Sequence, residues 1–231
     1  MTLTFGSLFA GIGGMDLGLE RAGLVCRWQV EIDDYCRRVL TKHWPDVPKY
    51  GDIREVSGEG LERVDLICGG FPCQDISIAG KQAGIDGERS GLWSEYVRLI
   101  RVVRPRYVLV ENVPNLLALG MGRVLGDLAE SGYDAEWDCI PASAVGAHHL
   151  RDRTFIVAYA HGIGLEGRVY QRARVGVEAF PTPTLWRNPA TPYVCRGTDG
   201  IPNWLDRLRV LGNAVVPQVA EWIGRRLVGA L

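Results

Sequence analysis

The sequence predicts an α/β fold built on a doubly wound, largely parallel β-sheet. Apolar segments that resemble strands alternate with segments of helical spacing over residues 3–131, a pattern typical of successive strand–helix units. A glycine-rich turn joins the first strand to the first helix, as in a nucleotide-binding βαβ unit. Two later apolar segments, Tyr133–Ile140 and Thr154–Tyr159, follow each other without a helix between them. They predict a hairpin that places an antiparallel strand at the edge of the sheet.

Length and composition are those of an ordinary globular protein. The chain has 231 residues, a net charge of −1, 47% hydrophobic residues and 23% charged residues, which suffices for one sizeable core. It has no apolar run of membrane-spanning length and no signal-peptide pattern at its N-terminus. Its six cysteines are irregularly spaced and form no C-x-x-C pair, which disfavours a metal site or a disulfide framework. We therefore expect a cytoplasmic protein with reduced thiols, no membrane segment and no metal.

The chain opens with a strand, a glycine-rich turn and a helix. The strand is expected over Leu3–Phe9 and the helix over Met15–Ala22, with Gly23 as its C-cap. The turn between them, Ala10–Gly14, departs from the dinucleotide pattern G-x-G-x-x-G. It fits either a bound nucleotide-like ligand or close packing of the strand against the helix.

An acidic residue follows the second strand. Leu24–Val30 is the predicted strand, and Glu31 stands at its end, about twenty residues after the glycine turn, where a carboxylate can accept hydrogen bonds from ribose hydroxyls. A helix then runs from caps at residues 33–34 to Trp44. Further along the chain, Asp52 either caps a turn or contacts the amino group of a ligand.

A cysteine and a glutamate follow two later strands. Val64–Cys68 leads into Gly69-Gly70-Phe71-Pro72-Cys73-Gln74, where two glycines and a proline hold the thiol on a stiff turn. A helix over Leu92–Val103 precedes the strand Tyr107–Val110, and Glu111 comes directly after that strand. In a parallel doubly wound sheet, both side chains lie on the edge where ligands bind.

The rest of the chain contains two irregular segments and two amphipathic helices. Residues 75–91 form an unusually long connection and are a candidate lid. Residues 161–203 are rich in proline, and seven arginines against four acids lie between His161 and Arg209. This charge fits either a phosphate-binding face or a solvated basic face. The helices are expected over Val124–Ser131 and at the C-terminus, where the inward positions are Val219, Ile223, Leu227 and Val228.

Five motifs in a fixed order establish a resemblance to a known family. They are Phe9-Ala10-Gly11-Ile12-Gly13-Gly14, Pro72-Cys73-Gln74, Glu111-Asn112-Val113, Arg151-x-Arg153 and Gly212-Asn213-Ala214-Val215-Val216-Pro217. With these motifs the chain resembles the DNA (cytosine-5) methyltransferases of bacteria and their phages, over residues 3–159 and 205–229. The resemblance implies the Rossmann-like fold of class I S-adenosylmethionine-dependent methyltransferases, with a mixed sheet. It also implies a catalytic domain over 1–159, a small irregular target-recognition region over 160–203, and a C-terminal helix within 204–231 that completes the catalytic domain.

The resemblance assigns cytosine chemistry to four residues. Cys73 would add to C6 of a cytosine flipped out of duplex DNA, so that C5 can attack the methyl group of S-adenosylmethionine. Glu111 would donate a proton to N3 of the base and accept a hydrogen bond from its N4 amino group. Arg153 would hold O2 and help to fix Cys73. Arg151 would stand behind these groups or face a phosphate.

Two sets of binding residues also follow from the resemblance. Phe9 would pack against the adenine of the donor and Glu31 would take its ribose hydroxyls. The full set assigned to the donor is Phe9, Ala10, Gly11, Ile12, Gly13, Gly14, Glu31, Ile32, Asp52, Ile53, Gly70, Pro72, Leu92, Asn213, Ala214 and Val215. The candidate DNA contacts are Ser77, Lys81, Arg89, Arg168, Arg172 and Arg174.

Two departures from the family pattern concern the base pocket and DNA recognition. His149 stands where the family's QxRxR motif has glutamine, which changes the local hydrogen bonding. The recognition region is short for the family, and fewer loops make fewer contacts with base edges. We therefore expect a short or degenerate target site, with phosphate contacts supplying much of the affinity.

Three other interpretations stay open on the sequence. They are a tRNA cytosine-5 methyltransferase, a non-catalytic or weakly active DNA-binding relative, and a small-molecule enzyme of Rossmann-like fold with a nucleophilic cysteine. The last of these leaves the motifs at Glu111, Arg151 and Asn213 unexplained. The expected partners are duplex DNA and a cognate restriction endonuclease of the same host, and the chain is expected to be a monomer.

Overall fold

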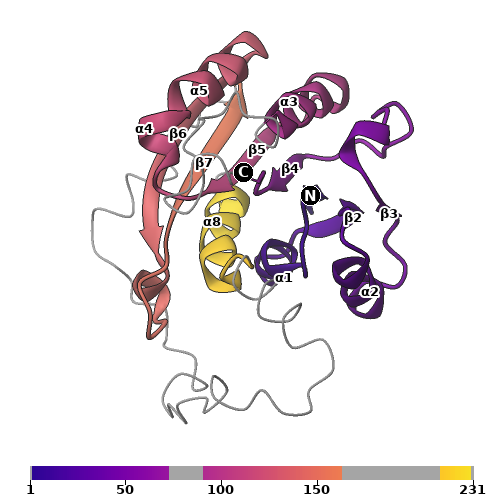
Figure 1. Ribbon diagram of the computed structural model, residues 1–231, viewed down its shortest axis with the longest axis horizontal. Helices are drawn as coiled ribbons and strands as arrows, with labels where there is room; N and C mark the ends of the chain where they lie inside the picture. The colour runs from indigo at the N-terminus through magenta and orange to yellow at the C-terminus, as the bar shows by residue number, and fades with distance from the viewer. Residues whose placement is uncertain (1, 73–90, 163–213, 230–231) are drawn as a thin grey trace.

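A seven-stranded sheet forms the centre of the molecule. The computed structural model describes residues 2–72, 91–162 and 214–229, and its strand order is β3-β2-β1-β4-β5-β7-β6 (Figure 1). Neighbouring strands from β3 to β5 are parallel, whereas β7 is antiparallel to both β5 and β6. The strands are β1 (Thr4–Leu8), β2 (Val25–Val30), β3 (Lys49–Tyr50), β4 (Leu66–Gly69), β5 (Tyr107–Asn112), β6 (Tyr133–Pro141) and β7 (Asp152–Ala160).

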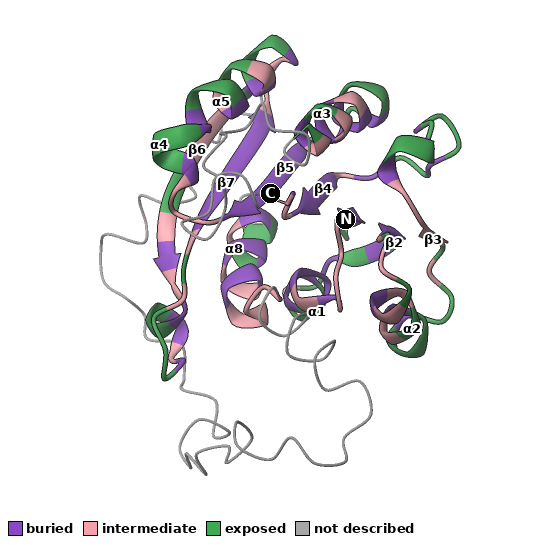
Figure 2. Cartoon of the chain, in the orientation of Figure 1, coloured by how far each residue is buried: buried purple, intermediate pink, exposed green. Residues whose placement is uncertain are grey.

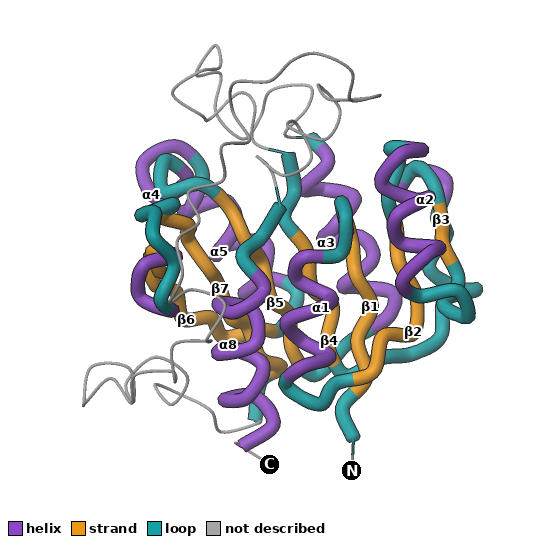
Figure 3. The backbone as a smooth tube through the Cα atoms, turned by 90° about the horizontal axis from the view of Figure 1, so that it is seen from below, coloured by secondary structure: helices purple, strands orange, loops and turns teal. Residues whose placement is uncertain are grey.

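Helices cover both faces of this sheet (Figures 1 and 3). Successive side chains of a strand point to opposite faces, so Ile67 packs in one apolar cluster and its neighbours Leu66 and Cys68 in the other. The helices on the Leu66 side are α1 (Gly14–Arg21), α2 (Asp34–His43) and α8 (Pro217–Gly229). Those on the Ile67 side are α3 (Leu92–Val103), α4 (Leu116–Leu119) and α5 (Met121–Glu130). The short 3₁₀ helices are η1 (Ile53–Glu55) and η2 (Ala142–Val145).

The two central strands are enclosed by this arrangement. Every residue of β4 and β5 is buried (Figure 2), as expected for parallel strands with helices on both faces. These strands therefore offer their carboxyl ends, rather than a face, to a ligand.

The order of strands and helices predicted from the sequence is confirmed. Asp33 caps α2 as expected, because its side chain accepts a hydrogen bond from the amide of Cys36 at 3.0 Å. Two short elements, α4 and η2, were absent from the sequence prediction, and α5 begins at Met121 rather than at Val124. Short elements of this kind carry too few apolar positions to show a period.

The predicted antiparallel hairpin at the sheet edge is confirmed: β6 is outermost and pairs antiparallel with β7, which lies second from the edge and pairs antiparallel with β5. One detail of the prediction is wrong. Val228 is 38% exposed and faces outward, whereas Val219, Ile223 and Leu227 are buried. Positions spaced by four stay on one face of a helix, and Val228 lies about 100° further round.

The C-terminal helix lies directly beside the first helix (Figures 1 and 3). Gly18 of α1 and Gly224 of α8 leave no room for side chains at this contact, since a Cβ on either would collide with the opposite helix. The chain before α8 also comes close, because a Cβ on Gly14 would collide with the carbonyl oxygen of Val215. The two ends of the described chain therefore meet beside the glycine turn.

The expectations about membrane segments, metal sites, thiols and the recognition region involve residues that the structure describes only in part. Among residues 2–72, 91–162 and 214–229, no helix is both long enough and apolar enough to cross a bilayer. The same residues contain no cluster of three or more side chains suited to a metal ion. The described cysteines, Cys26, Cys36, Cys68 and Cys139, are free thiols. The predicted recognition region lies outside the described residues from position 163 onward.

Candidate active site at the carboxyl edge of the sheet

The carboxyl ends of the five parallel strands lie side by side at one edge of the sheet. A row of residues at these ends is given by the pairings of Tyr50 with Val30, Val30 with Leu8, Leu8 with Gly69, and Gly69 with Val110. The residues that directly follow this row are Gly51, Glu31, Phe9, Gly70 and Glu111. The sequence predicted that Cys73 and Glu111 lie on this edge; Glu111 does, whereas Cys73 is outside the described residues.

Glu111 lies buried between two other motifs. The whole residue is 8% exposed. Its Oε1 lies 3.1 Å from Nε of Arg153, near the start of β7. The antiparallel pairing of Asn112 with Thr154 brings these two side chains together. On the other side, a Cβ built on Gly70 would lie 2.5 Å from Oε2 of Glu111. The carboxyl group therefore fits against the turn only because residue 70 has no side chain.

This enclosure changes the acidity of the carboxyl group. Burial raises the pKa of Glu111 to about 7, while the positive charges of Arg153 and Arg151 oppose the shift. Near neutral pH the carboxyl group is thus divided between its protonated and ionised forms. A group of that pKa can donate a proton at one step and accept one at another.

Asn112 joins the Glu111 strand to the turn that leads toward Cys73. Its Nδ2 donates to the carbonyl oxygen of Phe71 at 3.3 Å, and its Oδ1 accepts from the amide of Val113 at 2.8 Å. The side chain is 2% exposed, so these contacts are sheltered from water. From the sequence, Asn112 was assigned to a motif but to no role, although an amide directly after an acid at a strand end was an available signal.

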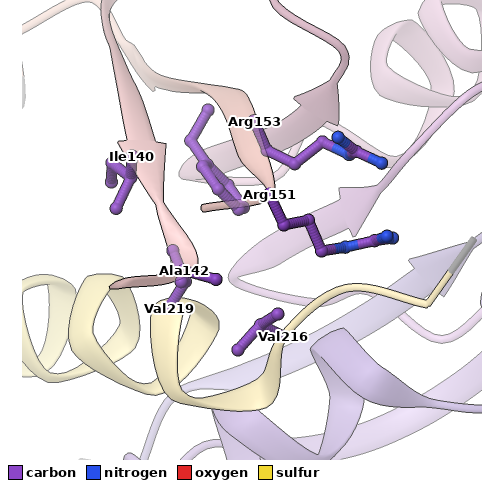
Figure 4. Close-up of a pocket in the computed structure, with 7 residues that line it drawn as sticks. Ile140, Ala142, Arg151, Arg153, Val216 and Val219 are labelled. Atoms are coloured by element: carbon purple, nitrogen blue, oxygen red, sulfur yellow. The ribbon is translucent and has the colours of Figure 1, made fainter. Parts of the chain in front are cut away.

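Arg151 connects the start of β7 to the chain before α8. Its Nη2 donates to the carbonyl oxygen of Ala214 at 2.7 Å, and its backbone has a φ of 37°. Arg151 and Arg153 extend in the same direction from the start of β7 (Figure 4). His149 lines a surface cavity with Arg151 and residues 214–218.

The two roles expected of the glycine turn, ligand binding and close packing, belong to different glycines. Gly11 has a φ of 57°, and a Cβ there would meet nothing within 4 Å, which leaves open space beside the backbone. Gly13 has a φ of 82°, and a Cβ there would lie 2.5 Å from the ring of Trp44. Gly11 therefore suits the approach of a ligand, whereas Gly13 is required for packing.

Glu31 is linked directly to that turn. Its Oε2 accepts from the amide of Gly11 at 2.7 Å, and its Oε1 accepts from the amide of Asp33 at 2.8 Å. Ile32 beside it is 61% exposed. Phe9 packs against Tyr96 with ring centroids 6.3 Å apart. The open glycine, the acid and an uncovered apolar side chain thus lie together.

Other residues assigned to the donor have structural contacts as well. Asp52 caps η1 by accepting from the amide of Arg54 at 3.0 Å, so the turn-capping alternative is confirmed. The Arg54 guanidinium also lowers the pKa of Asp52. Ile53 is buried in the core, and Leu92 packs partly buried against the same cluster.

Arg37 is a residue of this edge that the sequence analysis missed. Its guanidinium donates to the carbonyl oxygens of Glu31 and Ile32. The available signal was an arginine about one helical turn after the loop that carries Glu31. Sequence spacing, however, does not show which main-chain carbonyl groups the Arg37 side chain reaches.

Some of the predicted residues lie outside the described part of the chain. They are Cys73, Ser77, Lys81, Arg89, Arg168, Arg172, Arg174 and Asn213. Their roles, and the closing movement expected of residues 75–91, remain predictions.

Comparisons with known proteins agree with this geometry. A family model described as C-5 cytosine-specific DNA methylase matches residues 3–191. Type II methyltransferase M2.BsuMI of Bacillus subtilis is 39% identical over 160 residues, covering 66% of this chain and 41% of that protein. Type II methyltransferase M.HhaI of Haemophilus parahaemolyticus is 32% identical over 168 residues, covering 71% and 51% respectively.

A solved structure gives the same result for the fold. A protein described as a DNA modification methyltransferase encoded within an E. coli prophage superposes with a TM-score of 0.59 at 25% identity, covering 69% of this chain and 47% of that one. This chain thus spans about half the length of the relatives that it matches. The match of the family model to most of its length, together with motifs gathered on one sheet edge, shows that the chain belongs to the C-5 cytosine-specific DNA methylase family.

Proposed function

We propose that this chain transfers a methyl group from S-adenosylmethionine to C5 of a cytosine flipped out of duplex DNA. The observation that supports this most directly is the Glu111 pocket, in which a buried carboxyl group with a pKa of about 7 contacts Arg153 and abuts Gly70. The chemistry at C5 of cytosine requires a proton donor at N3, and a carboxyl group of ordinary pKa is ionised at neutral pH.

The reaction begins with a covalent step at Cys73. C5 of cytosine is a poor nucleophile, so the Cys73 thiolate forms a bond to C6 and pushes electrons into the ring toward N3. The protonated carboxyl of Glu111 gives its proton to N3 and, once ionised, accepts a hydrogen bond from the N4 amino group. Arg153 holds O2 of the base and stabilises the carboxylate of Glu111 after that transfer.

Methyl transfer and release complete the reaction. S-adenosylmethionine would supply a sulfonium methyl group when it is bound. The electron pair of the C4–C5 enamine double bond, which forms when Cys73 adds to C6, would make the new bond from C5 to that methyl group, and the donor would leave as the neutral thioether S-adenosylhomocysteine. A base, for which water suffices, then removes the C5 proton. The electron pair released at C5 re-forms the C5–C6 double bond as the Cys73 thiolate leaves C6. The N3 proton returns to Glu111, so the chain is restored.

The donor would bind along the other strands of the same edge. The open space beside Gly11 and the Glu31 carboxylate next to it suit a ribose, and the exposed Ile32 and the Phe9 ring suit an adenine. Ala214 and Val215, which approach Gly14 and Arg151, would close this pocket from the C-terminal side. Donor and base would thus be held on neighbouring strands.

Duplex DNA is the proposed substrate because the relatives that match are type II methyltransferases. A base inside a duplex is out of reach, so flipping is required, with Ser77, Lys81 and Arg89 as candidate phosphate contacts. The short recognition region favours a short or degenerate target site. Bisulfite sequencing of DNA from cells that express the chain tests this, and a fully specified site of about six or more base pairs would contradict it. A restriction endonuclease of the same host is the proposed partner, and the chain is proposed to act as a monomer in the cytoplasm.

A transfer assay tests the proposed function. Labelled S-adenosylmethionine is offered with duplex DNA or with tRNA to the wild-type chain, Cys73→Ser and Glu111→Gln. We expect label in DNA with the wild type, almost none with Cys73→Ser, and a large loss of rate with Glu111→Gln, because an amide cannot give a proton to N3. Label in tRNA alone would identify the RNA-directed alternative. Donor binding without any transfer would favour a non-catalytic DNA-binding protein.

A further inference from the structure

Arg37 closes the loop that carries two of the proposed donor contacts. It lies in α2, and helical side chains point back toward the N-terminus of their helix. From there its Nη1 donates to the carbonyl oxygen of Glu31 at 2.8 Å and to that of Ile32 at 2.9 Å. Its Nη2 contacts the carboxylate of Asp34. One guanidinium group therefore binds two successive peptide units at the end of β2.

The same guanidinium reaches the neighbouring strand end. A Cβ built on Gly51 would lie 3.6 Å from Nη1 of Arg37, an ordinary contact distance. Gly51 directly precedes Asp52, and Tyr50 before it accepts a hydrogen bond from the amide of Glu31 at 3.0 Å. Arg37 therefore lies where the two loops assigned to the adenosine part of the donor meet.

The bonding pattern separates what holds the carboxylate from what holds the main chain. The carboxylate of Glu31 is oriented by the amides of Gly11 and Asp33. The carbonyl groups on either side of the Ile32 α-carbon are held by Arg37. Hydrogen bonds from a charged donor are about twice as strong as those between neutral groups, and the Arg37 side chain is 30% exposed. Rotation of these peptides would move the Glu31 carboxylate and the Ile32 side chain together.

We propose that Arg37 is a positioning residue for the methyl donor. It acts through Glu31 and Ile32 to set the affinity for S-adenosylmethionine, and it takes no part in methyl transfer. The proposal rests on the proposed function, because it assumes that Glu31 and Ile32 contact the adenosine part of the donor. It adds a residue on a helix, outside the five motifs, to the donor site.

Donor affinity and turnover, measured separately, test this proposal. For Arg37→Ala we expect the Kd for S-adenosylmethionine, measured by calorimetry, and the KM for it to rise about tenfold, the equivalent of losing one good hydrogen bond. At saturating donor, kcat and the KM for DNA should stay within about twofold of the wild type, because only binding common to ground and transition states is lost. Arg37→Lys, which keeps the charge without the planar fork, should lie between the two.

A matched control and a double-mutant cycle separate positioning from a general loss of structure. Arg38→Ala removes the neighbouring arginine, whose guanidinium lies 5.8 Å from the ring of Tyr35, and should leave donor affinity unchanged. In a Glu31→Gln background, Arg37→Ala should weaken donor binding by less than about threefold, because the residue through which it acts is already impaired.

Each result bears on one or both proposals. Unchanged donor affinity in Arg37→Ala, or an equal loss in the Glu31→Gln background, overturns the role of Arg37 while the proposed function stands. A fall in kcat at saturating donor would also overturn it. If the wild-type chain binds no S-adenosylmethionine, the proposed function fails together with this inference.

Discussion

The carboxyl group of Glu111 couples the chemistry of the site to the stability of the fold. Its folded-state pKa of about 7 lies above the ordinary value of 4.5, so the folded chain binds a proton that the unfolded chain releases. The free energy of unfolding therefore falls as pH rises from about 4.5 through about 7. The same burial that destabilises the carboxylate supplies a proton donor near neutral pH.

Replacement of Glu111 by glutamine should remove this pH dependence. Between pH 6 and 8.5 we expect the free energy of unfolding of the wild type to fall by about 1.4 kcal/mol through Glu111, whereas Glu111→Gln lacks this contribution. Urea unfolding at both pH values measures it. Asp16, a second buried carboxyl group with a raised pKa of about 6, is present in both chains and cancels in the comparison. Equal pH slopes in the two proteins would show that Glu111 is not protonated as described.

The missing side chain at Gly70 is a second single-residue feature with a sharp consequence. Because a Cβ there would lie 2.5 Å from Oε2 of Glu111, Gly70→Ala must displace the carboxyl group. A misplacement of about 1 Å in a catalytic group can cost about 100-fold in rate, and we expect a loss of kcat of that order. The matched control is Gly126→Ala in α5, where a Cβ meets nothing within 4 Å. Equal activity of the two variants would contradict the role given to Glu111.

Among the secondary-structure elements, α1 and α8 hold in place the segment that we propose to line the donor site. The two helices approach at Gly18 and Gly224, and the chain that enters α8 passes over Gly14 through Val215. Arg151 holds the same segment through Ala214. Any outward movement of α8 would therefore carry Ala214 and Val215 away from the proposed donor site.

Overfilling this helix contact should weaken donor binding. A Cβ on Gly18 would collide with the carbonyl oxygen of Pro217 and with Ala220, so Gly18→Ala should lower the free energy of unfolding by roughly 1–3 kcal/mol. We also expect a raised Kd for S-adenosylmethionine, measured by calorimetry on the folded protein. Gly229→Ala, at the end of the opposing helix α8, adds a methyl group in open space and serves as the control. Unchanged affinity in Gly18→Ala would separate α8 from the donor site.

In the whole molecule, the features predicted best from the sequence are those set by strand ends. Apolar runs located β1, β2, β4 and β5, and parallel pairing then placed Glu31 and Glu111 on one edge. Contacts between side chains and main chain were not predictable, because the partners of Arg37 and Asn112 are carbonyl groups with no sequence signature. That β7 rather than β6 pairs with β5 depends on how the hairpin docks on the sheet, and the alternation of apolar residues does not decide between the two strands.

The central proposal is that Cys73 forms a covalent bond to cytosine during methyl transfer. Duplex DNA with 5-fluorocytosine in place of every cytosine provides the test, because fluorine at C5 leaves no proton to remove and blocks release of the thiolate. We expect an adduct that survives denaturation, requires S-adenosylmethionine, maps to Cys73 by mass spectrometry and is absent with Cys73→Ser. The absence of any adduct from a folded chain that binds S-adenosylmethionine would contradict the proposed mechanism.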